Sequence, residues 1–397
     1  MKRTLIYCSV LFGILVGFQL ATEAPAAETA KVLKLGNVTP WSGAGALFSK
    51  IIVDQGVRPL MRMVNDKGGI KVGGETYKLE LITEDDKYTA AGGRAAAEKL
   101  IFQDKVKFMV SNVAPASTQA IAPLATENKV IMIVGGSGVL IRPEWPYFFE
   151  TNPNFKQRMY SILSVAKKKY PQLKRLAALN ADDVTGLSIQ EIAPKFVLQF
   201  GLENVYNERH PRNAKDYYPF LTKMLAEKPD AFMSISTPGD LSQMVKQLRE
   251  LGFKGVILCL TTLADFDSFM KVAGVEASQG ILGWYDDYNS PNATPRMREF
   301  QEFYTKVWKG SPEDIHLTPY ITCLEVLVQA LEKANTFDPD RVKQVLETAE
   351  FETMIGRCRF EGKQTYGIGH RLNAIVRVGE VTGKKFVHVG EAVFREP

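Results

Sequence analysis

The stretch KLGNVTPWSGAGALFSKIIVDQGVRPLMRMVNDKGGI, residues 34–70, decides the fold. It begins within an apolar run, residues 32–38, that predicts a buried strand. A loop of small residues follows, and residues 57–64 then carry apolar side chains at offsets 0, 3, 4 and 7, which is typical of one helix face. The pair Gly68-Gly69 suits a left-handed end to that helix. A strand, a loop and a helix in this order open an α/β unit, whose ligands bind beyond the carboxyl ends of the strands.

A proline lies inside the predicted helix. Pro59 removes one backbone hydrogen bond from the helix, and its ring clashes with the preceding turn. We therefore expect the helix to kink near Gln55-Gly56, where the glycine eases the bend.

The rest of the chain repeats the alternation of strand and helix. Apolar runs predict further strands at residues 77–82, 106–110, 130–134, 176–179, 205–208, 231–235, 256–260 and 280–284. Helical patterns of ten or more residues separate most of them, which indicates a parallel, doubly wound sheet. Ser117 or Thr118 is placed to N-cap the helix that runs to Asn128.

Length and charge set the class of protein. At 397 residues the chain suits two domains, each with a sizeable core. A net charge of +5 is mild, and the one basic run, Lys167-Lys168-Lys169, fits the solvated end of a helix. These features argue against nucleic-acid binding.

The first residues predict a secretory signal peptide, residues 1–26. Lys2-Arg3 precede the apolar run 5–20, and small residues at 24–27 offer a cleavage site near Ala26 or Ala27. A membrane anchor is the competing interpretation, but the run contains polar and glycine residues and is shorter than the roughly 20 apolar residues of a membrane span. We expect the mature protein to be exported.

The cysteines do not form a disulfide framework. Removal of the signal peptide takes Cys8 and leaves Cys259, Cys323 and Cys358, which permit at most one disulfide. Cys259 and Cys323 lie in apolar patterns, so we interpret both as buried thiols.

No catalytic, metal or cofactor motif is evident in the sequence. The four histidines, at positions 210, 316, 370 and 388, have no metal-ligand spacing. The acidic groups Glu84-Asp85-Asp86 and Asp182-Asp183 could act as acid and base, but carboxylates solvated in turns explain them better. We therefore expect a binding protein without cofactor or metal, and not an enzyme.

A series of motifs follows in order along the chain: the P-x-SG turn, N-x-x-GGI, SNVAPASTQA, VIMIVGGSG, FFETNPN, DAFMSISTPGDLSQMVKQLRELGFKG and the strand around Gly356-Arg357-Cys358-Arg359-Phe360. In this order they resemble the type I periplasmic binding proteins, and within them the branched-chain amino-acid binding proteins of ABC transporters. The resemblance implies two Rossmann-like, doubly wound lobes joined by three hinge strands. It implies residues 30–150 plus 280–351 for lobe one and residues 151–279 plus 352–397 for lobe two.

The same resemblance implies a function. The chain would be a monomeric, periplasmic subunit of an ABC importer, whose two lobes close on a small-molecule ligand and present it to a membrane permease. A ligand sensor or regulator of the same fold is the alternative. An attached kinase, DNA-binding or transmembrane segment would favour the sensor, and none is evident in the sequence.

The resemblance also implies where the ligand binds, in loops that follow strands in both halves. The candidate ligand-binding residues are Trp41, Ser42, Asn112, Val113, Ala114, Pro115, Ser117, Gly136, Ser137, Gly138, Thr185, Thr237 and Thr261. Their small and polar side chains can offer hydroxyl and backbone N–H groups, although turns also use such residues.

This chain departs from the family at the positions that would anchor an amino acid. Pro115 stands where the amino-acid binders have a serine, and Gly138 where they have a threonine. Thr185 lies near one missing clamp tyrosine, and Thr261 stands where an acid would pair the ligand's ammonium group. A desolvated ammonium without a charged partner is unfavourable by several kcal/mol. We therefore expect an organic acid or another solute without a charged amine, preferably aromatic, over leucine, isoleucine or valine. Trp41, Trp284 and Tyr285 would form flat walls, although core packing also explains them, Trp284 above all.

Overall fold

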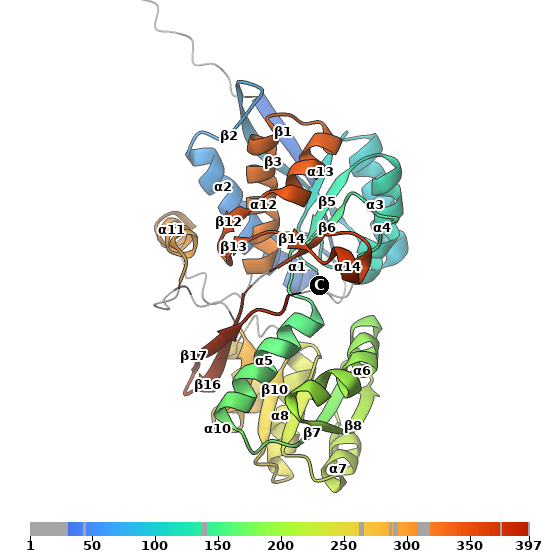
Figure 1. The fold of residues 1–397 in the computed structure, drawn as a ribbon, viewed down its shortest axis with the longest axis vertical. Helices are drawn as coiled ribbons and strands as arrows, with labels where there is room; N and C mark the ends of the chain where they lie inside the picture. The colour runs from blue at the N-terminus through green and yellow to red at the C-terminus, as the bar shows by residue number, and fades with distance from the viewer. Residues whose placement is uncertain are drawn as a thin grey trace, which may run out of the picture. The chain divides into compact units, whose positions relative to one another are not determined.

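Two large sheets with helices on both faces organise the chain (Figure 1). The structure is a computed structural model that describes residues 31–42, 45–136, 141–261, 266–285, 288, 293–308, 318–373 and 375–395. One sheet has eight strands and the other seven, and most neighbouring strands are parallel. The predicted α/β class with doubly wound sheets is confirmed.

The first sheet has the order β14-β15-β6-β5-β4-β1-β3-β2. Its strands are β1 Lys31–Thr39, β2 Ile70–Val72, β3 Glu75–Asp85, β4 Phe108–Val110, β5 Ile131–Val134, β6 Phe148–Glu150, β14 Phe360–Glu361 and β15 Arg371–Leu372. Only β2 and β14, at its two edges, run antiparallel to their neighbours. The carboxyl ends of the six strands between them therefore meet at one edge of the sheet.

Alternate strand residues enter two separate cores on the two faces of this sheet. Phe108 and Val110 of β4 belong to the core under α2 and α12, whereas Met109 belongs to the core under α3 and α4. Strands buried on both faces explain the continuous apolar runs in the sequence. The helices are α1 Ala46–Ile52, α2 Arg58–Asp66, α3 Ala90–Phe102, α4 Pro115–Glu127, α11 Pro295–Phe303, α12 Thr318–Ala334, α13 Pro339–Thr348 and α14 Lys363–Tyr366. A small hairpin of β12 Phe351–Thr353 and β13 Gly356–Cys358 adjoins them.

The second sheet has the order β17-β16-β11-β10-β9-β7-β8. Its strands are β7 Arg175–Ala181, β8 Glu203–His210, β9 Ala231–Ser234, β10 Val256–Cys259, β11 Leu282–Trp284, β16 Val376–Thr382 and β17 Lys385–Ala392. Its helices are α5 Phe155–Lys169, α6 Val184–Phe196, α7 Tyr218–Ala226, α8 Pro238–Glu250, α9 Phe266–Ala273 and α10 Val275–Ser278. Two cores again lie on opposite faces, one under α5 and α6 and the other under α7, α8 and α9.

The chain passes between the two sheets three times: after β6, after β11 and after β15. Sheet membership differs from the predicted lobe boundaries in two places. Strand β11 was expected to return to the first lobe, but it pairs with β10 and β16 of the second sheet because Leu282 and Trp284 enter the second core. Residues 352–372 were expected in the second lobe, but β15 pairs with β6 of the first sheet.

The helix break predicted from Pro59 has a structural counterpart. Residues Val53–Val57 form a π-helical turn between α1 and α2, and Pro59 lies in the first turn of α2. Val57 and Arg58 have helical backbone angles, so the proline lies within a continuous helix, directly after the π-helical turn. The hydrogen-bonding pattern therefore changes at Gln55-Gly56, where we expected the kink, and π-turns are a known cause of bends. The bend itself stays a prediction.

The glycine pair ends α2 as predicted. Gly68 and Gly69 have φ values of +113° and +96°, and the Gly69 N–H donates to the Val64 carbonyl oxygen at 3.0 Å. This arrangement turns the chain directly into β2.

The three described cysteines, Cys259, Cys323 and Cys358, are free and buried. Burial raises the pKa of the Cys259 thiol to about 12 and that of Cys323 to about 11. Both are therefore the buried thiols that the sequence predicted.

Candidate functional site

The loop after β1 is fixed by a carboxylate at the end of β3. Asp85 accepts hydrogen bonds from the N–H of Trp41 at 2.9 Å, the hydroxyl of Ser42 at 2.6 Å and the N–H of Lys87 at 2.9 Å. Burial favours the neutral carboxyl, but these hydrogen bonds outweigh it and lower the pKa of Asp85. Asp85 therefore holds this turn as an ionised acceptor. The indole N–H of Trp41 is buried and has no partner among the described residues, so it can donate to a ligand.

The loops after β4 and β5 hold each other. The side-chain oxygen of Asn112 accepts a hydrogen bond from the N–H of Val38 at 3.3 Å. The backbone carbonyl oxygen of Asn112 accepts one from the N–H of Gly136 at 3.0 Å. A Cβ on Gly136 would lie 2.5 Å from the Val113 carbonyl oxygen, so only glycine fits at this approach. The Nδ2 group of Asn112 is buried and has no partner in the part of the chain that the structure describes. Ser137 and Gly138 of the predicted site lie outside the described residues.

Helix α4 starts earlier than predicted. Its N-cap is Ala114, which makes no side-chain cap, and Pro115 follows in the first turn. Because proline favours that position, the helix begins there, and Ser117 and Thr118 lie inside it. The prediction that one of them is the N-cap was wrong. The first turn of α4 consequently has backbone N–H groups that no side chain caps.

Ser117 lies between two helices. It is 1 % exposed, and a Cβ added to Gly93 of α3 would come within 2.2 Å of its hydroxyl oxygen. Its hydroxyl also faces the buried carboxyl of Asp86, whose pKa is raised by burial in spite of that contact. The structure therefore gives Ser117 a packing role between α3 and α4.

Two threonines of the second sheet use their hydroxyl hydrogens within their own loops. Thr237 caps α8, accepting from the N–H of Asp240 at 3.1 Å and donating to its carboxylate at 2.8 Å. Thr261 accepts from the N–H of Ser236 at 3.0 Å and donates to its carbonyl oxygen at 2.6 Å. A hydroxyl has one hydrogen to donate, so neither threonine can donate to an anionic ligand in this arrangement. Thr185 is half-buried in the first turn of α6.

A buried hydrogen-bonded chain that the sequence did not indicate lies beside these loops. His210 contacts the carbonyl oxygen of Pro211 through Nδ1 at 2.9 Å and the Ser236 hydroxyl through Nε2 at 2.8 Å. Ser236 in turn contacts the hydroxyl of Ser234 at 3.0 Å. Burial lowers the pKa of His210, and its Nδ1 faces a carbonyl instead of the carboxylate of a catalytic triad. These hydrogen bonds fix the carboxyl end of β9, whose last residue is Ser234.

An arginine absent from the predicted site lies at the carboxyl ends of β10 and β11. Arg158, in the first turn of α5, is 3 % exposed and donates to the Leu260 carbonyl oxygen at 3.2 Å and to the side chain of Asn152. Its guanidinium stacks on Trp284, 4.4 Å from the ring centroid. Trp284, which we predicted as a wall of the site, also packs in the second core.

A buried ion pair joins β6 to β15. Glu150 and Arg371 are 2.7 Å apart and are 0 % and 4 % exposed at their side chains. Burial raises the pKa of Glu150 to about 7, although Arg371 and Arg158 oppose that shift. Glu150 is the last residue of β6, directly before the chain passes from the first sheet to the second.

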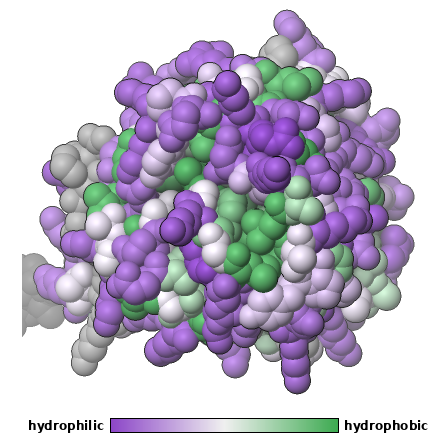
Figure 2. Space-filling view, turned by 90° about the horizontal axis from the view of Figure 1, so that it is seen from below, coloured by the Kyte–Doolittle hydropathy of each residue, from purple (hydrophilic) through white to green (hydrophobic). Residues whose placement is uncertain are grey.

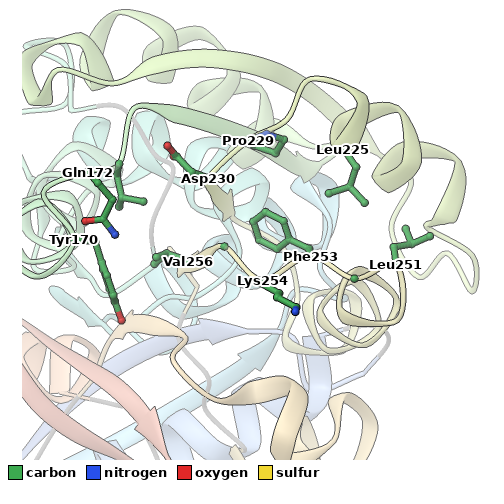
Figure 3. Close-up of a pocket in the computed structure, with 12 residues that line it drawn as sticks. Tyr170, Gln172, Leu225, Pro229, Asp230, Leu251, Phe253, Lys254 and Val256 are labelled. Atoms are coloured by element: carbon green, nitrogen blue, oxygen red, sulfur yellow. The ribbon is translucent and has the colours of Figure 1, made fainter.

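A surface depression of about 590 Å³ lies at the opposite edge of the second sheet (Figure 3). Its lining includes Leu173, Asp230 and Gly255, which directly precede or adjoin the amino ends of β7, β9 and β10. Figure 2, seen from below, shows an apolar area bordered by hydrophilic residues on that side of the molecule. The depression is therefore separate from the candidate loops, which follow the carboxyl ends of the strands.

The described residues contain neither a metal-binding cluster nor a membrane-spanning helix. No group of three or more His, Cys, Asp or Glu side chains within the described ranges could hold a metal ion. None of the helices in those ranges is long and apolar enough to cross a membrane.

Comparison with known proteins identifies the family. A family model described as periplasmic binding protein matches residues 32–385. The chain belongs to the periplasmic binding protein family. It is 25% identical to the Leu/Ile/Val-binding protein homolog 7 of Brucella melitensis, over 91% of this chain and 90% of that protein.

Solved structures share the fold. A solute-binding protein of an ABC transporter from R. palustris, in complex with benzoate, has a TM-score of 0.74 at 19% identity, over 91% of this chain and 96% of that one. A branched-chain amino acid transporter substrate-binding protein from Streptococcus pneumoniae, in complex with isoleucine, has a TM-score of 0.75 at 18% identity, over 92% and 99%. The predicted family, fold class and solute-binding role are thus confirmed at the level of the family.

Proposed function

We propose that this chain is the periplasmic solute-binding subunit of an ABC importer, and that its ligand is a small organic acid. An aromatic acid is favoured over leucine, isoleucine or valine. The loops that follow the strands in both halves bind the ligand, and a membrane permease receives it from the monomeric protein.

One observation carries the choice of ligand: four carboxylates in the loops after the strands already have partners, and burial raises the pKa of a fifth, Asp86, which favours its neutral form. Asp85 binds its own turn, as described above, and Asp182 lies 2.7 Å from Arg209. Asp183 caps α6 and pairs with Arg212, and Asp240 accepts from Tyr217 at 2.6 Å. Among the described loops, none of these acids is left for the ammonium group of an amino acid, whose desolvation is unfavourable by several kcal/mol without one.

Donors for an anion remain. The first turn of α4 has no side-chain cap, and a helix N-terminus attracts negative charge. The indole N–H of Trp41 is a second free donor. The relatives leave both ligand classes open, since the R. palustris protein is in complex with benzoate and the S. pneumoniae protein with isoleucine.

A thermal-shift panel on ligand-stripped protein tests this. The panel comprises benzoate, 4-hydroxybenzoate, short aliphatic acids, the corresponding amides, and leucine, isoleucine and valine. A ligand at 100 times its Kd stabilises a protein by about 2.7 kcal/mol. For a chain of this size that corresponds to a midpoint increase of about 3 °C. We expect this shift with one or more acids; the same shift with leucine, and none with any acid, would contradict the proposed ligand class.

We further propose that residues 1–26 are a signal peptide and that the protein binds its ligand without turnover. Expression of the full-length chain should place the protein in the periplasmic fraction with a new N-terminus near residue 27. Mass spectrometry of the bound acid, after prolonged incubation and denaturation, should recover it unchanged. Retention of Met1 in a membrane-bound product would contradict the first proposal, and conversion of the acid would contradict the second.

A further inference from the structure

We infer that Arg158 binds the carboxylate of the ligand and makes the site selective for organic anions. This inference rests on the proposed function, since it names the residue that recognises the ligand. It begins from the position of Arg158 at the carboxyl ends of β10 and β11, the edge at which open α/β sheets bind their ligands.

The guanidinium group is buried but only partly bonded. A guanidinium has five N–H donors. Arg158 uses one for the Leu260 carbonyl oxygen and one for the Asn152 side chain, and its Nε–H has no partner among the described residues. Within that part of the chain, three donors, including the Nε–H, are therefore left on a side chain that is 3 % exposed. Such a group can hold a carboxylate with two parallel hydrogen bonds.

The charge around Arg158 is not balanced. The buried charged groups that influence it are Glu150 and Arg371, and these two already pair at 2.7 Å. Arg158 itself has no carboxylate within ion-pair distance among the described residues. Counted over the described residues, the cluster contains two guanidinium groups and one carboxyl group, and an incoming anion would neutralise the excess positive charge.

The surroundings of Arg158 also fit an aromatic ligand. Its guanidinium lies 4.4 Å from the centroid of the Trp284 ring. The indole N–H of Trp284 donates to the Leu260 carbonyl oxygen at 3.2 Å, which fixes the orientation of the ring. A planar acid with its carboxylate on Arg158 would find a flat apolar surface beside it.

A purely structural role is the alternative, and a matched variant separates the two. Arg249 is also a partly buried arginine of the second sheet's helices, with a phenylalanine ring 5.8 Å away. It donates to the carbonyl oxygens of Phe253 at 2.7 Å, Gly255 at 3.1 Å and Ala277 at 3.3 Å. Two of these partners, Phe253 and Gly255, line the depression at the amino ends of the strands, so Arg249→Met removes a structural guanidinium at the edge opposite the candidate loops.

The experiment compares Arg158→Met, Arg158→Lys and Arg249→Met with the unmodified mature protein. Calorimetric titration measures the Kd of benzoate, 4-hydroxybenzoate, a short aliphatic acid, benzamide and leucine. We expect Arg158→Met to raise the Kd of the best-bound acid by roughly 100-fold. Arg158→Lys should restore part of the affinity because it keeps the charge without the fork, and Arg249→Met should leave the Kd unchanged.

The ligand-free proteins provide a second readout. Arg158→Met removes an unbalanced buried charge, and the Leu260 carbonyl oxygen keeps the hydrogen bond from Trp284. We therefore expect its unfolding midpoint to stay within about 3 °C of the unmodified protein. A much larger loss would show that Arg158 is a structural residue and would overturn the inference.

The other outcomes separate this inference from the proposed function. An acid bound equally well by Arg158→Met overturns the role of Arg158 and leaves the solute-binding function intact. Binding of leucine or benzamide without any acid overturns the anion selectivity, again with solute binding intact. If none of these probes binds, the inference is overturned, and identification of the co-purified solute then decides the proposed function.

Discussion

Replacement of Gly69 with alanine is expected to destabilise the protein by several kcal/mol. Gly69 has a φ of +96°, and a Cβ at this position would lie 2.2 Å from the Tyr77 carbonyl oxygen. That oxygen belongs to the backbone of β3, which pairs with both β2 and β1, so it has little room to move. The variant must break this pairing or distort the end of α2, and it would add the cost of a left-handed backbone, about 1–2 kcal/mol.

The neighbouring glycine provides the control. Gly68 also has a positive φ, +113°, but a Cβ there meets nothing within 4 Å. Gly68→Ala should therefore lower the free energy of unfolding only by the cost of a left-handed backbone at alanine, about 1–2 kcal/mol. Urea unfolding of both variants measures the difference, and equal free energies of unfolding would show that the contact with Tyr77 does not matter.

These two glycines illustrate what the sequence could predict about the fold. A glycine pair after an apolar helical face is a local signal, and so are the alternation of strands with helices and the break near Pro59. No local signal in the sequence shows which of the two sheets β11 and β15 join. The sheet that each one joins depends on which of two distant strands it meets, and Leu282 or Arg371 carries no sign of that choice within its own segment.

The candidate site shows the same limit. The loops after β1, β4 and β5 could be predicted because small and polar residues follow apolar runs. The roles of Thr237 and Thr261 could not be predicted. Thr237 caps α8 by bonding to Asp240, and Thr261 bonds to Ser236, but a threonine that binds a ligand would look the same in the sequence. Arg158 was missed because its partners lie elsewhere in the chain. A single arginine in the first turn of α5, after FFETNPN, was the available signal.

Replacement of Arg371 with methionine should lower the free energy of unfolding by about 3–5 kcal/mol above neutral pH. It removes the cation that lies 2.7 Å from Glu150 and leaves a carboxylate that is 0 % exposed. Breaking a buried pair from one side typically costs this much, because Glu150 loses the one cation that pairs with it among the described residues; Arg158 lowers its pKa from outside ion-pair distance. Arg359→Met is the matched control, since Arg359 pairs with Glu361 at 2.6 Å but is 56% exposed, whereas Glu361 is 16% exposed. Solvent screens a pair whose cation is exposed, so this variant should lose clearly less stability than Arg371→Met.

The pH dependence identifies Glu150 as the cause. Burial raises its pKa from 4.5 to about 7 in the folded protein. A raised carboxyl pKa means that the folded state keeps a proton that the unfolded state has released, so stability falls as the pH rises through the folded pKa. Without Arg371 that pKa rises further, and the fall continues to higher pH. The deficit of Arg371→Met should therefore grow between about pH 6, where Glu150 is mostly neutral in both folded proteins, and about pH 9.

Urea unfolding at these two pH values measures the deficit, with Glu150→Gln/Arg371→Met as the decisive comparison. The double variant lacks both charges, so its deficit relative to the unmodified protein should no longer increase with pH in the way that the single variant's does. If the deficit of Arg371→Met is as small as that of Arg359→Met, the pair does not stabilise the junction of β6 and β15. If it is large but independent of pH, the lost contacts of the arginine, such as the bond from its Nη1 to the Asn152 carbonyl oxygen at 3.4 Å, explain it and the stranded carboxylate does not.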